Sequence, residues 1–493
     1  MLLFEELREA WRGESRDHRV ALLCIVVIAF ALRLRYLGQP MRYDESVTYL
    51  YFVKQTWSDA LSLYTYPNNH LFHTLLAKLS VTAFGNAPWA LRLPAFVAGM
   101  LVVAATYAVV RALYNPRAAL YAMAVVASSG VLVLFSTNAR GYSLVVLAFL
   151  LLVLLAVRLQ RSARSGTWIT FAIVGALGLW TIPVMLYPLG AVSVWIALSF
   201  LLDGKSFELR RLFIALGVAA GLTLLAYSPV ISREGIPAII GNKFVVPQNW
   251  FDFFEQLPSS VGQALRSWSL GVPPIASLAL LAFAVVALRY HAATSQFRVG
   301  LPLAAFVCTA WLLVVNHRSP FPRVFQWLLP LAAALVGAGI TYALERRPRT
   351  KAILESTPTL AVMLAIATAL SVVASRAVLL ARDTGTYLDA EQASATLSRV
   401  LQPGDRVLTA QPTNAPLEYY LDRLGVSQSY SSQDEKSAAR IIVVVNSFEG
   451  QRLADVVARS EVRDTVRFAP VAVVATLPAS TIIIFQRRDA APK

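Results

Sequence analysis

The sequence predicts an all-α, multi-pass membrane domain of about eleven transmembrane helices, followed by a small extracytoplasmic α/β domain. Three observations lead to this prediction. Apolar runs of membrane-spanning length recur along the chain as far as Leu380. Lysine and arginine gather in alternate loops between these runs. After Leu380 the chain becomes polar, and short apolar stretches alternate with segments of helical periodicity.

The composition excludes a large soluble protein. Of the 493 residues, 57% are hydrophobic and only 15% are charged. A soluble protein of this size could not cover so much apolar surface with so few charges. The formal charge of +16 does not indicate nucleic-acid binding, because the basic residues lie in short clusters between apolar runs. Cys24 and Cys308 lie in separate apolar runs, so neither a disulfide framework nor a zinc site is predicted.

The predicted spans each approach the ~20 residues that a bilayer requires. They lie at about 20–36, 91–113, 118–136, 141–158, 167–182, 184–202, 212–231, 273–289, 299–316, 323–344 and 358–380. Arginines precede the first span, which places the amphipathic segment 1–19 in the cytoplasm. The chain 20–381 then forms the membrane domain, and an odd number of spans places 382–493 outside. We expect the protein in the cell (plasma or inner) membrane, with the first span retained because no cleavage site follows it.

Two predicted outer loops are long, 38–89 and 232–267. The first contains MRYDESVTYLY, for which we expect a helix from Glu45 to about Lys54 with Asp44 as a possible N-cap. The apolar stretch that follows in the same loop is expected to form an interfacial or re-entrant helix, because its histidines and lysine argue against a full span. The second loop mixes proline, glycine and aromatic residues and could lie on the membrane as a lid.

The C-terminal segment 382–493 has the length of a common small domain. Its predicted helices lie at 388–401, 416–424 and 450–459, and its predicted strands at 406–410, 440–446, 471–477 and 480–486. It contains no glycine-rich phosphate-binding motif. We therefore expect a structural cap with no chemistry of its own.

The candidate chemistry lies in the outer loops. From spacing alone, Asp44 and Glu45 are either a helix cap with a solvated charge or a general base or metal ligand at the membrane surface. Arg33, Arg140 and Arg323 lie at outer ends of spans, where the positive-inside bias does not explain them. Any one of them could be an arginine whose head group reaches to the interface. Several together suit the bidentate binding of an anionic lipid phosphate.

Two histidines lie close together in the first outer loop. His70 and His73 are three residues apart and would share a helix face. A histidine pair can bind a metal ion, but no third ligand follows at a recognisable spacing. A structural or hydrogen-bonding role is the alternative.

Several motifs occur in a recognisable order. They are Arg33-Leu34, Tyr43-Asp44-Glu45, Tyr66-Pro67-Asn68-Asn69-His70, Leu91-Arg92-Leu93-Pro94, Ala139-Arg140-Gly141-Tyr142 and Pro322-Arg323 with Leu329-Pro330. The ordered set resembles the membrane glycosyltransferases of the GT-C superfold, in the group of the protein O-mannosyltransferases and lipid A aminoarabinose transferases (glycosyltransferase family 39 and relatives). Where many relatives have Pro-Pro-Leu, this chain has Asn68-Asn69-His70, and the second acidic residue of the aminoarabinose transferases has no clear equivalent.

The resemblance implies a transferase that moves a hexose or pentose from a polyprenyl-phosphate donor to a hydroxyl acceptor, with inversion. The acceptor would be a protein, a lipid or a cell-envelope glycan. Asp44 would be the general base, and Glu45 would orient it or join a site for a divalent metal. The residues expected at the lipid phosphate are Arg140, Arg323, Arg33 and His70, and those expected at the substrate are Tyr43, Asn68, Asn69 and Tyr142.

Two other classes of function are compatible with such a chain. A transporter or flippase of lipid-linked sugars would also have many spans and outer arginines. Transporters often contain internal repeats and charges in the middle of their spans, whereas here the charges lie at segment ends and the halves are dissimilar. A non-catalytic scaffold whose C-terminal domain binds partners is the third possibility.

Overall fold

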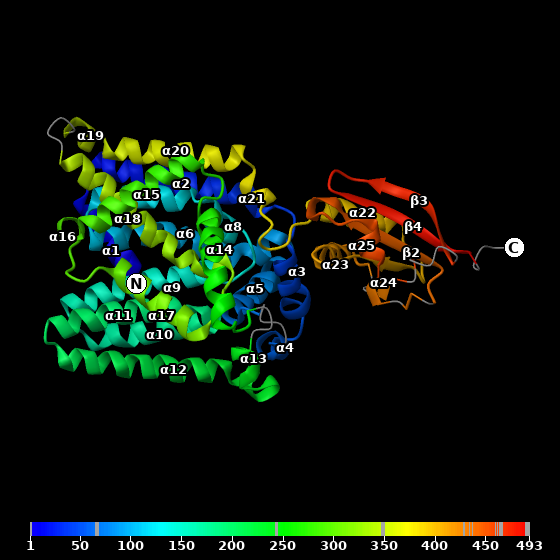
Figure 1. The fold of residues 1–493 in the computed structure, drawn as a ribbon, viewed down its shortest axis with the longest axis horizontal. Helices are drawn as coiled ribbons and strands as arrows, with labels where there is room; N and C mark the ends of the chain where they lie inside the picture. Colours follow the sequence, from blue (N-terminus) through cyan, green and yellow to red (C-terminus); the bar gives the residue numbers. More distant parts are fainter. Residues whose placement is uncertain are drawn as a thin grey trace. The chain divides into compact units, whose positions relative to one another are not determined.

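The computed structural model describes residues 2–64, 69–241, 245–346, 351–426, 429–432, 434–435, 437–458, 460, 462 and 467–488. Contacts between Cα atoms divide the chain into two compact units. The membrane unit comprises Met1–Leu37, Leu61–Ala77 and Arg92–Leu379, and the mixed unit comprises Gly38–Ala60, Lys78–Leu91 and Leu380–Lys493. Figure 1 shows the helices and the sheet with the labels used below.

Helices occupy the place of every predicted span. They are α2 (Arg16–Leu37), α6 (Pro88–Leu113), α7 (Pro116–Ser128) with α8 (Gly130–Ser136), α9 (Tyr142–Arg161), α10 (Ser165–Thr181), η2 (Pro183–Met185) with α11 (Leu186–Leu202), α12 (Ser206–Glu234), α15 (Pro274–Arg289), α17 (Leu301–Asn316), η3 (Pro322–Leu328) with α18 (Leu329–Glu345) and α20 (Thr357–Ala374). In the described part of the chain, seven are long and apolar enough to cross a membrane, or eight if α7 and α8 form one span. Three more, α10, α15 and α17, are shorter apolar helices. The predicted multi-pass, all-α membrane domain is confirmed.

Shorter helices connect these segments. They are α1 (Leu2–Gly13), α4 (Trp57–Ser62), α5 (Leu71–Phe84), α13 (Ile236–Ile240), α14 (Trp250–Trp268), α16 (His291–Thr294), α19 (Lys351–Glu355) and α21 (Ala377–Leu380). The helix α5 is the apolar segment predicted to be interfacial or re-entrant. The second predicted outer loop is largely helical, because α12 continues to Glu234 and α13 and α14 follow.

The helices α7 and α8 meet at a bend of 60°. Ser129 has an extended conformation between them, with φ −61° and ψ 117°, so the helix is interrupted there. Arg33 of α2 donates from Nη1 to the carbonyl oxygen of Ala127 at 2.8 Å, which satisfies a backbone acceptor at the end of α7. Gly99 lets α6 pass close by, because a Cβ there would lie 2.2 Å from the Cβ of Ser136. The bend is therefore held from two sides.

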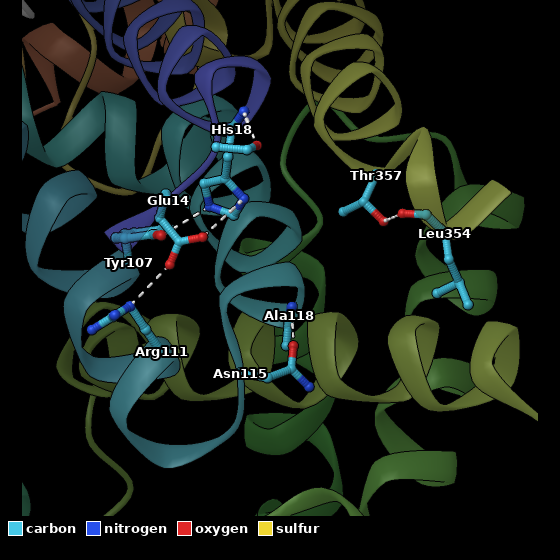
Figure 2. A network of polar contacts seen from close by, with 9 residues as sticks. Glu14, His18, Tyr107, Arg111, Asn115, Ala118, Leu354 and Thr357 are labelled. Carbon is cyan, nitrogen blue, oxygen red and sulfur yellow. Dashed lines mark hydrogen bonds and ion pairs between the residues drawn. The ribbon is translucent and has the colours of Figure 1, made fainter. Parts of the chain in front are cut away.

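A polar network joins the first two helices to α6 (Figure 2). The ring nitrogen Nε2 of His18 lies 2.8 Å from the hydroxyl of Tyr107. The Glu14 carboxylate lies 3.7 Å from the other ring nitrogen of His18 and accepts from Arg111 Nε at 3.2 Å. These contacts hold the start of α2, and the residue Glu14 just before it, against the end of α6 that contains Arg111.

The C-terminal part of the mixed unit is a four-stranded sheet with short helices, as predicted. The strands are β1 (Arg406–Leu408), β2 (Arg440–Asn446), β3 (Phe468–Thr476) and β4 (Ser480–Arg487), in the order β1-β2-β4-β3. Strands β1 and β2 are parallel, and the other two pairings are antiparallel. The helices are α22 (Ala390–Val400), α23 (Asn414–Arg423), α24 (Ser429–Ser432) and α25 (Leu453–Val457), with a 3-10 turn η5 (Ser447–Glu449). Ile441, Val443, Phe468 and Phe485 form the centre of its core.

The first predicted outer loop does not belong wholly to the membrane domain. Its stretches Gly38–Ala60 and Lys78–Leu91 group with the C-terminal part instead. The backbone N–H of Met41 donates to the hydroxyl of Tyr420 at 3.2 Å, and that of Tyr43 donates to the carbonyl of Gly385 at 2.9 Å. Such contacts between distant parts of the chain leave no local trace in the sequence.

Candidate functional site

Four predicted site residues come together in the membrane unit, and we call them the basic cluster. His70 precedes α5, Arg140 and Tyr142 lie where α9 begins, and Arg323 lies in η3. Arg140 Nη2 is 2.9 Å from His70 Nε2, and Arg323 Nε donates to the Tyr142 hydroxyl at 3.0 Å. The rings of His70 and Tyr142 meet edge to face, with centroids 5.2 Å apart. Three of the four residues predicted to bind the lipid phosphate are thus held together, with one predicted substrate residue.

The hydrogen bonds of His70 fix its protonation. The backbone N–H of Gly141 donates to Nδ1 at 2.8 Å, so Nδ1 carries no proton. Burial, and then the positive charge of Arg140, hold the pKa of His70 well below its ordinary value, so the ring is neutral and its proton is on Nε2. This N–H faces the guanidinium of Arg140, which also can only donate. Two donors therefore converge, and one shared acceptor, such as a phosphate oxygen, would satisfy both.

The turn that carries Arg140 is shaped by glycine. A Cβ on Gly141 would lie 2.5 Å from Thr181 Cγ2 and 3.2 Å from the Cβ of His70. Glycine is therefore the residue that allows this turn to approach His70. Arg140 is only 2% exposed, and a cation so far removed from water interacts strongly with a nearby anion.

The other predicted residues of the membrane unit have structural contacts. Arg33 donates from Nη1 to the carbonyls of Ala29 and Ala127, at 3.2 and 2.8 Å, and thereby holds the bend between α7 and α8. Asn69 is fully buried, donating to the Leu63 carbonyl at 2.7 Å and accepting from the Thr74 hydroxyl at 2.7 Å. It fixes the start of α5. Asn68 lies outside the described residues.

The acidic pair lies in the mixed unit, on α3 (Tyr43–Thr48). The prediction that Asp44 is the N-cap is wrong, because the cap is Arg42 and Asp44 lies within the first turn. Glu45 supplies the capping contact instead: its Oε1 accepts from the backbone N–H of Arg42 at 2.9 Å. Glu45 is completely buried, whereas Asp44 is half-buried. Of the two acidic residues, Asp44 is the less buried.

The first turn of α3 is held by the segment 384–386. The backbone N–H groups of Tyr43 and Asp44 donate to the carbonyls of Gly385 and Thr384, at 2.9 and 3.3 Å. Arg42 Nη1 donates to the Thr386 hydroxyl at 2.7 Å. N–H groups at a helix start lack partners inside the helix, so these carbonyls complete α3. The orientation of Asp44 thus depends on a segment far along the chain.

A π-helical turn, η1 (Tyr49–Val53), continues α3 and makes a second contact with the C-terminal part. The Tyr49 hydroxyl donates to Asp422 Oδ2 at 3.1 Å, and Lys54 forms an ion pair with the same carboxylate. Burial raises the pKa of Tyr49, so its hydroxyl stays protonated and donates. The predicted helix from Glu45 to Lys54 is thus present as α3 and η1 together.

Metal ligation was one prediction for the acidic pair and the histidines. Within the ranges that the structure describes, no group of three or more histidine, cysteine, aspartate or glutamate residues is arranged to hold a metal ion.

Comparison with known proteins agrees with this architecture. Residues 69–233 match the model of the dolichyl-phosphate-mannose-protein mannosyltransferase family, a stretch that contains His70, Arg140 and Tyr142. The structure of ArnT from Cupriavidus metallidurans in the apo state is similar with a TM-score of 0.62, at 13% identity, over 94% of this chain and 97% of that one. The chain has the GT-C fold. The structure of the same protein bound to undecaprenyl phosphate aligns with a TM-score of 0.58, at 15% identity, over 96% and 99% of the two chains. No curated protein sequence matches significantly.

The predicted resemblance to GT-C membrane glycosyltransferases is therefore confirmed. Sequence reasoning missed three features of the candidate site: the capping role of Glu45, the bond from Gly141 to His70 and the hold of segment 384–386 on α3. Gly141, between Arg140 and Tyr142, was a local signal for the bond to His70. The other two depend on geometry that no local motif encodes.

Proposed function

We propose that this GT-C protein is a glycosyltransferase that moves a sugar from a polyprenyl-phosphate donor to a hydroxyl acceptor on the non-cytoplasmic face. The acceptor belongs to a protein, a lipid or a cell-envelope glycan. The observation that carries the proposal is the convergence of donors in the basic cluster, where His70 and Arg140 point N–H groups toward one another at 2.9 Å. An anion shared by the two would remove that conflict, and the leaving group of such a transfer is an anionic lipid phosphate.

The reaction is a single displacement. The acceptor oxygen attacks the anomeric carbon as the bond from that carbon to the phosphate oxygen breaks, and the configuration inverts. Asp44 takes the proton of the acceptor hydroxyl, a role that suits the less buried residue of the pair. Arg140 and Arg323 bind the phosphate, whose negative charge grows as the bond breaks, so fixed cations stabilise the transition state more than the ground state.

Two further residues support this assignment. The Tyr142 hydroxyl accepts from Arg323 and so fixes its guanidinium. Glu45 is used in capping α3, which leaves Asp44 as the base and makes Glu45 a positioning residue. The ArnT structure that contains undecaprenyl phosphate supports a polyprenyl phosphate as the lipid part of the donor.

The test uses the purified protein, radiolabelled sugars on undecaprenyl phosphate and acceptors extracted from cell envelopes. We expect Asp44→Asn to lower transfer by about 10²–10⁴-fold while undecaprenyl phosphate still binds. Arg140→Ala should weaken binding of the lipid as well as transfer, because it removes a charge-assisted contact. Arg318→Ala is the control, an arginine of the predicted outer turn that also contains Arg323, whose Nη1 donates at 3.5 Å to the carbonyl of Ile240.

Two outcomes would contradict the proposal. One is wild-type transfer by both the Asp44 and the Arg140 variants. The other is movement of sugar-linked lipid across vesicle membranes without any transfer, which would identify a flippase.

A further inference from the structure

Three uncharged polar side chains beside the basic cluster have no hydrogen-bond partner among the described residues. They are His73, Asn138 and Gln326, and in each one both polar atoms of the side chain are unpartnered. All three are at most 1% exposed. A buried polar group without a partner is costly and rare in native proteins. Six such atoms in one region therefore require an explanation.

Two of these side chains lie one turn from a member of the cluster. His73 follows His70 by three residues, and the N–H of Thr74 donates to the His70 carbonyl at 2.8 Å, so the chain is already helical from His70 and the two histidines lie on the same side of it. Gln326 follows Arg323 by three residues in the 3-10 helix η3. Side chains three apart in a 3-10 helix lie above one another, so Gln326 is aligned with Arg323.

The third lies in the turn that carries Arg140. The N–H of Arg140 donates to the carbonyl of Asn138 at 2.7 Å, which makes the backbone between them tight. Each of the three segments that build the basic cluster thus contributes at least one cluster residue and one polar side chain that has no hydrogen-bond partner among the described residues. The unpartnered side chains form a second layer, which we call the polar layer: His73, Asn138 and Gln326.

The chemistry of the polar layer differs from that of the basic cluster. An amide side chain offers donors and an acceptor, and a neutral imidazole offers one of each. A phosphate only accepts, so it would leave the two amide oxygens unpaired. Hydroxyl groups both donate and accept, and a ring with several hydroxyl groups could satisfy all three side chains. Water molecules could do the same, and they are the alternative occupant.

We propose that His73, Asn138 and Gln326 bind hydroxyl groups of the donor sugar while the adjacent basic cluster binds the phosphate that carries it. This inference rests on the proposed function and defines its substrate more closely. The polar layer contributes no charged side chain, and the cluster beside it contains the buried Arg140 and the partly buried Arg323. A cationic sugar would be repelled there, and an anionic one would find acceptors as well as donors. The sugar is therefore a neutral hexose or pentose.

The test compares two probes on the purified full-length protein: undecaprenyl phosphate alone, and the same lipid carrying mannose, glucose, galactose or arabinose. The variants are Asn138→Leu and Gln326→Leu, in which an apolar side chain of similar size replaces the amide. We expect each to lower affinity for the preferred sugar-linked lipid about tenfold or more, because it removes hydrogen bonds to the sugar. Affinity for undecaprenyl phosphate should stay unchanged.

A second readout separates binding from folding. In the ligand-free protein these leucines remove unpaired buried atoms, so we expect the Tm of Asn138→Leu and Gln326→Leu to equal or exceed that of the wild type. The control Gln296→Leu removes an amide that does have a partner, the Tyr114 carbonyl at 2.7 Å. It should lower the Tm and leave both affinities unchanged.

The outcomes are distinct for this inference and for the proposed function. If Asn138→Leu and Gln326→Leu change the two affinities equally, or change neither, the polar layer does not bind the sugar and holds water instead. If the wild type binds undecaprenyl phosphate but no variant alters the preference for a sugar, this inference fails and the proposed function stands. If the wild type binds neither lipid, both are overturned.

Discussion

His70 determines the electrostatics of the basic cluster. Its Nδ1 accepts from the N–H of Gly141, which leaves Nε2 to carry the proton of a neutral ring. A protonated His70 would add a third positive charge beside Arg140 and Arg323, in a place that water does not reach. The neutral ring instead offers one directed N–H without that cost. The pKa of this residue therefore links the pH of the medium to the stability of the site.

The lowered pKa of His70 predicts a loss of stability in mild acid. Below the ordinary pKa of about 6.5, His70 of the unfolded chain binds a proton that the folded chain does not, so folding becomes less favourable as the pH falls. This difference in proton binding lowers the free energy of unfolding by up to about 1.4 kcal/mol for each pH unit below that pKa. His70→Gln keeps a polar side chain without the titration. Between about pH 7.5 and about pH 5.5, the Tm of the wild type should fall more than that of His70→Gln. Equal slopes for the two proteins would show that His70 is protonated in the folded state.

The helix α3 is the element on which the proposed base depends. It has only six residues and packs through backbone hydrogen bonds to the segment 384–386. Isolated helices of this length do not persist in water, so the contacts with Gly385 and its neighbours keep α3 folded. Gly385 has φ +69°, and a Cβ there would lie 2.6 Å from the Cβ of Tyr43 and 2.7 Å from that of Pro412. Glycine therefore permits the close approach that orients Asp44.

Gly385→Ala should displace α3 and lower sugar transfer without weakening lipid binding. A displacement of about 1 Å at a catalytic group can reduce a rate by about 10²-fold. Gly404→Ala is the matched control, because Gly404 also has positive φ (+88°) but nothing lies within 4 Å of its Cβ position. It should cost about 1–2 kcal/mol of stability and leave the rate unchanged. Measuring kcat and the Kd for undecaprenyl phosphate for both variants tests this. An equal loss of kcat in the two would mean that backbone strain, and not the approach to Tyr43, was responsible.

Elements with a local cause could be predicted from the sequence. Long apolar runs predicted the position of every membrane-spanning helix. Short apolar stretches predicted the strands of the C-terminal part, such as 440–446, which is β2 in the structure. Arg140 and Arg323 stood out because the charge asymmetry of loops does not explain them. The cap of α3 was predicted two residues from its observed position, at Asp44 and not at Arg42, because an acidic residue suits a helix start and the capping contact of Glu45 is not visible in the sequence. The contact of Tyr43 with Gly385 joins residues far apart in the chain, which no periodicity reveals.

Within the described residues, helical segments occupy all eleven predicted spans. Seven or eight of these segments are long and apolar enough to cross a membrane, and α10, α15 and α17 are shorter. The alternation of basic loops predicts that the N-terminal and C-terminal segments lie on opposite sides of the membrane. The exposed loop residue Ser162 follows α9 on the predicted inner side, and the exposed Ser398 of α22 lies on the predicted outer side.

Cysteine labelling tests this orientation. In a chain whose Cys24 and Cys308 are replaced by alanine, Ser398→Cys should react with a membrane-impermeant maleimide in intact cells. Ser162→Cys should react only after the membrane is permeabilised. The reverse pattern would contradict the orientation, and labelling of both from outside would contradict the odd number of spans.

The grouping of α3 with the end of the chain has a consequence for biosynthesis. Met41 and its partner Tyr420 are separated by 379 positions, and Arg42 and Thr386 by 344. At a translation speed of about 5–20 residues per second, α3 leaves the ribosome well before the segment that completes it. The membrane helices can insert meanwhile, but α3 lacks its partners until the residues from Thr384 to Tyr420 have been made. A chain truncated before residue 384 would therefore lack the contacts that hold α3 in place.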